Sequence, residues 1–147
     1  MIRRLAFACV TLVALSAPAF AQGAGNQLRD WGLLGVWSAR CDLPASRANN
    51  HFRYVISADG RAWLERDFGN PEQNDRSEIV SAVLRPDGTL ALTIDFTSIS
   101  QVRLNVYTKV EGRVRVIYNR GPNDDVSVEN GILKHNGQPT PWSSRCS

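Results

Sequence analysis

Apolar and polar residues alternate along most of the chain beyond residue 33, and short polar stretches containing glycine interrupt the alternation. Successive side chains of an extended strand point to opposite faces, so this pattern predicts half-buried β-strands. No stretch of ten or more residues beyond residue 21 has a helical period, and one helical turn is expected within 26–34. Strands are expected over 34–41, 51–57, 61–68, 77–85, 89–97, 100–109, 113–119, 124–129 and 132–134.

Three tight turns punctuate this pattern, and each is a three-residue stretch that ends in glycine: Ala58-Asp59-Gly60, Pro86-Asp87-Gly88 and Val110-Glu111-Gly112. Such a stretch is typical of a type I turn with a left-handed bulge, which sets the residues that face each other across a hairpin. Apolar residues then meet apolar residues in all three hairpins, which supports these registers. The expected pairs are Tyr54 with Leu64, Ile56 with Ala62, Val80 with Ile94, Ala82 with Leu92, Leu84 with Leu90, Val106 with Val116 and Thr108 with Val114.

The tight turns alternate with longer, more polar connections over 42–50, 69–76, 97–99 and 120–123. In a closed meander, alternate connections lie at opposite ends. The sequence therefore predicts an all-β, eight- to nine-stranded antiparallel up-and-down barrel, with a β-sandwich as the alternative. The longer loops would surround the end at which a small ligand enters.

The first 21 residues contain, in order, the basic, apolar and small-residue regions of a secretory signal peptide. Arginines at positions 3 and 4 precede an apolar run over 5–17, and small side chains follow at Ala19 and Ala21. A membrane anchor is the alternative, but a run of about 13 residues is shorter than the roughly 20 that span a bilayer. We therefore expect a signal peptide over 1–21, a lead segment over 22–32, one domain over 33–147, a periplasmic or secreted location, and no membrane span.

Composition and charge narrow the expected partners. The chain has 17 Lys and Arg against 14 Asp and Glu, and 43% of its residues are hydrophobic, as in ordinary globular proteins. Removal of the two signal-peptide arginines would leave 15 basic and 14 acidic side chains, a net charge of +1. The remaining charges alternate in sign without a basic cluster, so nucleic acid is not an expected partner.

Cleavage would also remove Cys9 and leave Cys41 and Cys146, which can pair in only one way. In an exported chain this pair predicts a disulfide that ties the start of the domain to its end. The two cysteines end similar segments, W-S-A-R-C over 37–41 and W-S-S-R-C over 142–146, which could seal the sheet edge to edge. Two cysteines are too few for zinc, and His51 and His135 lack ligand spacing, so no metal is expected.

Gly35-Val36-Trp37 opens the first expected strand and resembles the G-x-W motif of lipocalins and related calycins. The strand count and the alternation of connections are similar as well, over most of 33–147. The resemblance implies a small barrel whose Trp37 packs across the closed end against an arginine from after the last strand, here Arg145. The T-D-Y motif and the long C-terminal helix of lipocalins are missing. The chain is also similar to periplasmic metalloprotease-inhibitor barrels, and its G-x-W-S start is similar to avidins.

Catalytic arrangements are not apparent in the sequence. It contains no G-x-S-x-G elbow and no phosphate-binding glycine loop, and it has two histidines to serve as bases. The paired carboxylates Asp124 and Asp125 follow a Gly-Pro-Asn stretch and are expected in a loop. We therefore expect a non-enzymatic protein without a cofactor.

The expected registers place four candidate ligand-binding side chains beneath the long-loop end. Phe52, Tyr54 and Arg66 continue the inward face of the second and third strands, and Tyr118 ends that of the seventh. An arginine among aromatic side chains can hold a carboxylate or another anion on an apolar body. The alternative is that Arg66 lies outside past a bulge, or extends from the rim to water.

Three functions fit these observations. The first is a barrel that binds a small apolar or anionic ligand. The second is a periplasmic protease inhibitor or other protein-binding barrel, which would contact its partner through 22–32 or the open-end loops. The third is a structural envelope protein. Phe52, Tyr54, Phe96 and Tyr118 would fill much of a short barrel, whereas Ala62 and Ala82 would leave gaps.

Overall fold

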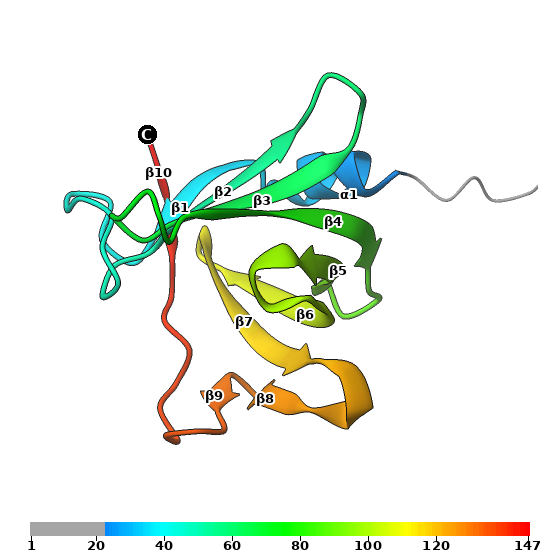
Figure 1. Cartoon of the computed structure of the whole chain (residues 1–147). Coiled ribbons are helices and arrows are strands. Elements are labelled where there is room, and N and C mark those ends of the chain that lie inside the picture. The colour runs from blue at the N-terminus through cyan, green and yellow to red at the C-terminus, as the bar shows by residue number, and fades with distance from the viewer. Residues whose placement is uncertain (1–22) are drawn as a thin grey trace, which may run out of the picture.

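The computed structural model describes residues 23–147, so the expected signal peptide and Cys9 lie outside the described residues. One α-helix, α1 (Ala24–Trp31), precedes ten β-strands (Figure 1). Two short 3-10 helices, η1 (Thr97–Ile99) and η2 (Pro122–Asp124), follow β5 and β7. The strands are β1 (Gly35–Ser38), β2 (His51–Ile56), β3 (Ala62–Asp67), β4 (Asp75–Leu84), β5 (Leu90–Phe96), β6 (Gln101–Val110), β7 (Arg113–Arg120), β8 (Val126–Glu129), β9 (Ile132–Leu133) and β10 (Ser144–Cys146).

All ten strands form one antiparallel sheet in which consecutive strands pair from β1 to β9, and β10 returns to pair with β1. The sheet curls into a half-barrel (Figure 1). The expected all-β meander is thus confirmed, and the alternative of a two-sheet sandwich is wrong. The nine expected strands are present, and the tenth lies within the second W-S-x-R-C segment.

Cys41 and Cys146 form the expected disulfide. The two W-S-x-R-C segments lie side by side, because β1 and β10 pair with Trp37 opposite Arg145 and Ser38 opposite Ser144. The disulfide and this pairing attach the end of the chain to the first strand. Disulfides of this kind are typical of oxidising compartments outside the cytosol.

Helix α1 closes the tight-turn end of the half-barrel. Leu28 and Trp31 are buried in one core with Leu33 and the inward residues of the strands. Trp31 Nε1 donates a hydrogen bond to the carbonyl oxygen of Gly88, in the turn between β4 and β5, at 2.9 Å. Burial of these side chains stabilises a helix longer than the single turn expected from the sequence. One side of α1 is therefore packed into the core, while Asn26, Arg29 and Asp30 stay exposed.

The first two hairpin registers are largely as expected. Tyr54 lies opposite Leu64 and Ile56 opposite Ala62, and in the second hairpin Ala82 lies opposite Leu92. The expected pairing of Val80 with Ile94 is wrong. A bulge in β4 places Ile79 opposite Ile94 and leaves Val80 59% exposed.

The third hairpin is one residue out of the expected register. Both Glu111 (φ 50°) and Gly112 (φ 74°) adopt left-handed conformations, as in a two-residue type I′ turn, and Val110 pairs with Arg113. Thr108 consequently lies opposite Arg115. A bulge between Val106 and Tyr107 adds a second shift, so Val106 lies opposite Tyr118. A shift of one residue exchanges the two faces of a strand, so β6 turns a different set of side chains inward: Arg103, Asn105 and Tyr107.

Candidate functional site

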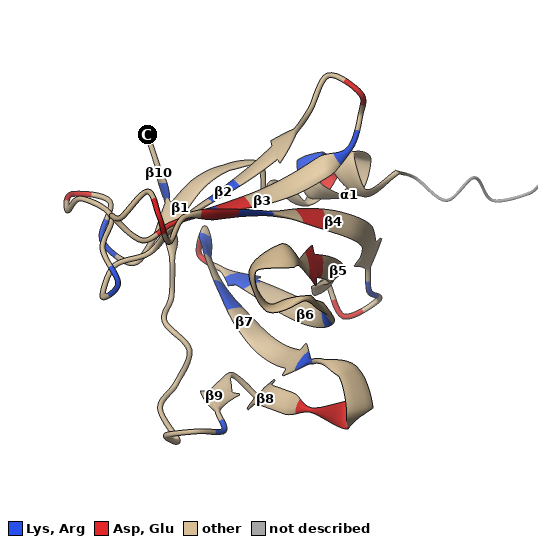
Figure 2. Ribbon diagram, in the orientation of Figure 1, with Lys and Arg blue, Asp and Glu red and all other residues tan. Residues whose placement is uncertain are grey.

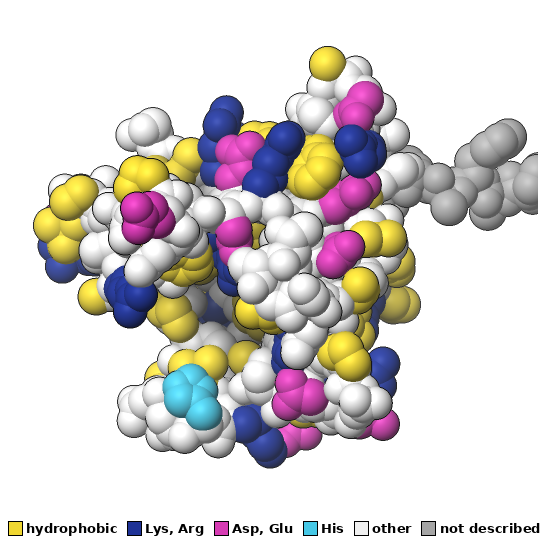
Figure 3. All heavy atoms as spheres, viewed as in Figure 1, with side chains coloured by type: hydrophobic (Ala, Val, Ile, Leu, Met, Phe, Trp, Pro, Cys, Tyr) yellow, Lys and Arg dark blue, Asp and Glu magenta, His cyan; other side chains and the backbone are white. Residues whose placement is uncertain are grey.

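A cavity of about 320 Å³ lies inside the curl of the sheet. Figure 3 shows the molecule hollowed between the body of the sheet and the β8–β9 segment, with Lys or Arg atoms visible inside the hollow. The C-terminal segment 134–143, here called the strap, contributes Thr140, Pro141 and Ser143 to the wall. Most of the wall is apolar or aromatic: Trp37, Phe52, Tyr54, Leu64, Phe96, Ile99, Tyr107, Val114, Val116, Val128, Leu133 and Pro141.

Three of the four candidate ligand-binding residues line this cavity, namely Phe52, Tyr54 and Arg66. The expected inward position of Tyr118 is wrong. The pairing of β6 with β7 shifts between Val106 and Tyr107, so Tyr118 pairs with Val106 while Val116 and Asn119, on either side of it, line the cavity. The bulge thus turns Tyr118 away from the wall.

Two buried tyrosines meet on the cavity wall. The hydroxyl of Tyr54 donates to that of Tyr107 at 3.2 Å, and the rings pack edge to face with centroids 6.2 Å apart. Burial raises the pKa of both phenols above the usual value, and for Tyr54 the neighbouring Tyr107 raises it further. Both hydroxyls are therefore neutral hydrogen-bonding groups at physiological pH.

Arg66 points inward, directly opposite Phe52 in the register, and its guanidinium group lies 4.8 Å from the Phe96 ring centre. It is held by a bidentate ion pair with Asp75 and a hydrogen bond to Ser98. Burial alone would raise the pKa of Asp75, but hydrogen bonds from Arg66 and Ser98 outweigh that effect and lower it. The charge of Arg66 is therefore compensated from within the protein.

A second arginine, Arg103, is buried on β6 at the centre of a polar network. Its Nε donates to Asn119 Oδ1 at 2.7 Å, and its Nη1 donates to Asp125 Oδ2 at 2.8 Å and to Gln101. Its Nη2 donates to the Asp125 carbonyl oxygen and to Ser127 Oγ. Every nitrogen of this guanidinium group is thus used within the protein.

The third arginine on the wall, Arg115, lies on β7 beside the strap. Its guanidinium carbon is 4.6 Å from the centre of the Trp142 ring, and its buried Nε has no hydrogen-bond partner. Basic residues recur along β6 and β7 (Figure 2). The cavity is lined by three arginines and, within residues 23–147, by no Asp or Glu. A wall with arginines and without carboxylates favours an anionic or hydrogen-bond-accepting ligand.

The expected registers missed Arg103 and Asn105 because the 110–112 turn was taken to have three residues, which exchanges the two faces of β6. They missed Asn119 because the bulge between β6 and β7 shifts the inward face of β7. Alternation along β7 gives no signal for Arg115, which stands between Val114 and Val116. The register at the opposite end of β6 would have predicted the inward positions of Arg103 and Asn105. Pairing Phe96 with Gln101 across the 97–100 connection sets Ile94 opposite Arg103. Since Leu90, Leu92 and Ile94 are plainly a buried face, this count places Arg103 and Asn105 inside.

Trp37 and Arg145 lie opposite each other in the paired strands β1 and β10. Trp37 is buried, and its Nε1 donates to the Leu33 carbonyl oxygen at 2.7 Å. Arg145 is exposed, and its side chain passes over Gly35, where an added Cβ would lie 3.0 Å from the guanidinium Nε. Gly35 also has φ +115°, so both space and backbone conformation explain the glycine of the G-x-W motif.

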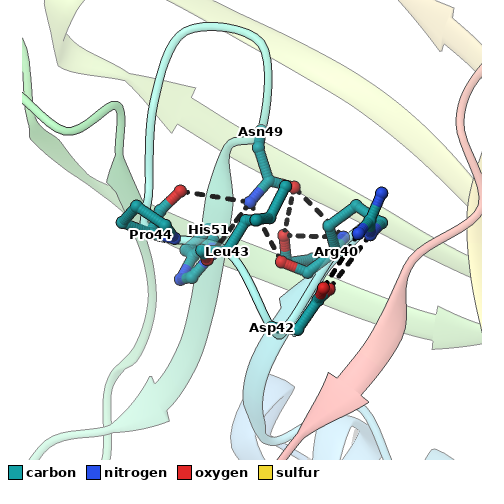
Figure 4. A network of polar contacts seen from close by, with 7 residues as sticks. Arg40, Asp42, Leu43, Pro44, Asn49 and His51 are labelled. Atoms are coloured by element: carbon teal, nitrogen blue, oxygen red, sulfur yellow. Dashed lines mark hydrogen bonds and ion pairs between the residues drawn. The ribbon is translucent and has the colours of Figure 1, made fainter.

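The long loop after β1 is organised by one side chain, Asn49 (Figure 4). Its Oδ1 accepts from Ser38 Oγ and the Arg40 N–H, and its Nδ2 donates to the carbonyl oxygens of Arg40, Leu43 and Pro44. His51 Nε2 lies 3.3 Å from the same Nδ2. Asn49 thus anchors the loop that follows β1 beside the disulfide.

Residues 23–147 contain no group of three or more His, Cys, Asp or Glu that could hold a metal ion. The same part of the chain contains no helix long and apolar enough to cross a membrane. Fold and site together define an all-β half-barrel, closed by a helix at one end, with an arginine-lined apolar cavity toward the other. No protein-family model, curated protein or solved structure matches this chain.

Proposed function

We propose that this protein is a non-enzymatic binding protein that holds a small apolar or anionic ligand in the cavity of the half-barrel. The observation that carries the proposal is the wall itself, which combines aromatic and aliphatic side chains with three arginines and, in the described chain, no carboxylate. Small-molecule sites are typically apolar concavities with a few convergent polar groups. The inward hydroxyls of Tyr54 and Tyr107 add two such groups.

The size of the cavity limits the ligand. About 320 Å³ corresponds to roughly ten water molecules at about 30 Å³ each, at the low end of ligand sites of about 300–1,000 Å³. The lining also contains none of the His, Cys, Asp and Glu side chains that usually serve as bases or nucleophiles, which supports binding over catalysis.

The location proposed for this activity is the periplasm or the cell exterior, after cleavage of a signal peptide behind Ala21. The Cys41–Cys146 disulfide supports an oxidising compartment. Mass spectrometry of the protein recovered from the exported fraction tests the cleavage, because the chain would begin at Gln22.

Native mass spectrometry of the exported protein tests ligand binding directly. We expect an added mass that leaves on denaturation. Val116→Phe, which fills the cavity, should lose this mass, whereas Ile117→Phe on the same strand but outside the lining should retain it. A wild-type protein with the bare mass of the oxidised chain would contradict the proposal and favour protein partners at the open-end loops.

A further inference from the structure

The buried hydroxyl groups of Tyr54 and Tyr107 carry one proton more than their contact uses. Tyr54 lies on β2 and Tyr107 on β6, which are separated in the sheet by β3, β4 and β5, so the two side chains meet across the interior of the half-barrel. The hydrogen bond between them uses one of the two hydroxyl protons. Within residues 23–147 neither hydroxyl has another hydrogen-bond partner, and both residues line the cavity. This tyrosine pair therefore keeps one proton to donate to a ligand.

Asn105, two residues before Tyr107 on the inward face of β6, supplies a second donor on the wall. The orientation of its amide follows from Arg103, because a guanidinium group can only donate. Arg103 Nε donates to Asn119 Oδ1, so Asn119 Nδ2 is the atom that donates to Asn105 Oδ1. The Nδ2 of Asn105 then has one contact in the described chain, with the Arg103 carbonyl oxygen at 3.5 Å. At least one of its two N–H groups is left for an acceptor.

The charges around the cavity favour an uncharged ligand over an anion. Arg66 and Arg103 are each paired with an aspartate. The guanidinium group of Arg115 stacks on Trp142, which does not line the cavity. An anion that left water for this cavity would therefore meet arginines that already have partners, and burial of an incompletely paired charge is costly.

Resting on the function proposed above, we infer that the ligand is an uncharged carbonyl compound, such as a ketone, an ester or a lactone, whose oxygen accepts a hydrogen bond from the tyrosine pair. A carbonyl oxygen has two lone pairs and no proton of its own, so it matches the free hydroxyl proton and the N–H of Asn105. Phe52 and Leu64 share the inward face of β2 and β3 with Tyr54 and line the same cavity, so the rest of the ligand is apolar.

Two matched sets of probes test this assignment by isothermal titration calorimetry. The first set is acetophenone, isopropenylbenzene and benzoate, and the second is cyclohexyl methyl ketone, isopropenylcyclohexane and cyclohexanecarboxylate. Within each set the shape is nearly constant, while the variable group is a carbonyl, an alkene without an acceptor, or an anion. The wild-type protein should bind the ketone of at least one set about tenfold more tightly than the alkene and the carboxylate, because only the ketone satisfies the donors without bringing in a charge.

The Tyr54→Phe/Tyr107→Phe variant removes both hydroxyls and keeps both rings, a change that leaves no unpaired polar group at the contact and should preserve the fold. This variant should bind the ketone and the alkene with similar affinity. Tyr118→Phe is the control, because it also removes one tyrosine hydroxyl but from a position on β7 that does not line the cavity. It should keep the preference of the wild type.

Equal binding of ketone and alkene by the wild type, or tighter binding of the carboxylate, would overturn the inference while leaving the cavity function standing. A preference for the ketone that survives in Tyr54→Phe/Tyr107→Phe would overturn the role of the tyrosine pair. Failure of the wild-type protein to bind any of the probes would also overturn the inference, and the added mass in the native mass spectrum then decides separately whether the cavity holds a ligand.

Discussion

Val114 at the start of β7 and Ser143 at the end of the strap donate their backbone N–H groups to each other's carbonyl oxygens, at 2.9 and 2.8 Å. Ser143 leads directly into β10, which pairs with β1, so this bridge connects the β1–β10 edge of the sheet to β7. At the other end of β7, Asn119 pairs with Val128 of β8 instead. The half-barrel is therefore closed at its tight-turn end, and β8, β9 and the strap surround the cavity toward the long-loop end.

Loss of the disulfide should destabilise this closure. The Cys41→Ser/Cys146→Ser variant releases a crosslink between residues 105 apart in the sequence, for which the chain-entropy model gives about 4–5 kcal/mol and measured losses are typically about 2–5 kcal/mol. Urea unfolding of the variant and of the oxidised wild type measures the difference. Ser144→Ala, an exposed change in β10, is the control and should unfold like the wild type. Equal midpoints for the double variant and the wild type would contradict the prediction.

Asn49→Ala should lower the free energy of unfolding by about 1–3 kcal/mol, because it leaves buried Ser38 and the backbone carbonyl groups of the loop without their partner. Chemical denaturation measures this loss. Asn136→Ala removes an exposed asparagine that accepts a single hydrogen bond from the Gln138 N–H, and it should cost much less. Similar losses in the two variants would show that Asn49 does not organise the loop.

The buried tyrosine pair should make the protein less stable in alkali. Unfolded tyrosines lose their protons near pH ~10, whereas burial raises the pKa of Tyr54 and Tyr107 in the folded protein. The folded state then holds protons that the unfolded state has released, so the free energy of unfolding falls as the pH rises above about 10.

Phenolate absorbance in a Tyr118→Phe background, where Tyr54 and Tyr107 are the two tyrosines left, measures the shift directly. Ionisation should begin well above pH ~10 and coincide with unfolding. The Tyr54→Phe/Tyr107→Phe variant should lose less stability in alkali than the wild type. Ordinary phenolate titration in the folded background variant would contradict the prediction.

Asp75→Asn should weaken the dependence of stability on acid pH. Burial opposes ionisation of Asp75, but hydrogen bonds from Arg66 and Ser98 outweigh it and hold its pKa below the usual value. Its contribution is therefore present above about pH 4 and is lost as the pH falls through the folded-state pKa. The variant should be less stable than the wild type at neutral pH and lose less stability on acidification.

Denaturation midpoints measured between about pH 6 and pH 2 check this prediction, with Asp30→Asn on the exposed side of α1 as the control. An acid response of Asp75→Asn identical to that of the wild type would show that the Arg66–Asp75 pair does not contribute as described.

Turn residues and the alternation of apolar and polar side chains predict the register of the first hairpin, between β2 and β3. Asp59 and Gly60 form a tight turn, and the alternation on each side of it is clear, so the pairs Tyr54–Leu64 and Phe52–Arg66 follow from counting. The inward position of Arg66 could be predicted for this reason. Its ion pair with Asp75 could not, because that contact depends on the pairing of β3 with β4 across a long polar loop.

For the third hairpin, between β6 and β7, the sequence does not decide the register. Val110-Glu111-Gly112 is compatible with a three-residue or a two-residue turn. The three-residue register pairs Val106 with Val116, whereas the two-residue register pairs Tyr107 with Val116. The buried face of β5 and its pairing with β6 select the two-residue form, which places Arg103 on the cavity wall and leaves Val106 off it. Strand side chains alternate with a period of two, so one residue of register decides the whole set of residues that lines the cavity.

The sequence by itself determined the all-β meander, the nine expected strands and the pairing of Cys41 with Cys146, because turn residues, alternation and cysteine number are local properties. Only the tertiary structure decided which arginines share the cavity and that α1 closes its end. It also decided that Arg115 alone among those arginines lacks a carboxylate partner in the described chain. The physical reason is that burial and charge compensation depend on strands and loops far apart in the chain, whose register is set by packing.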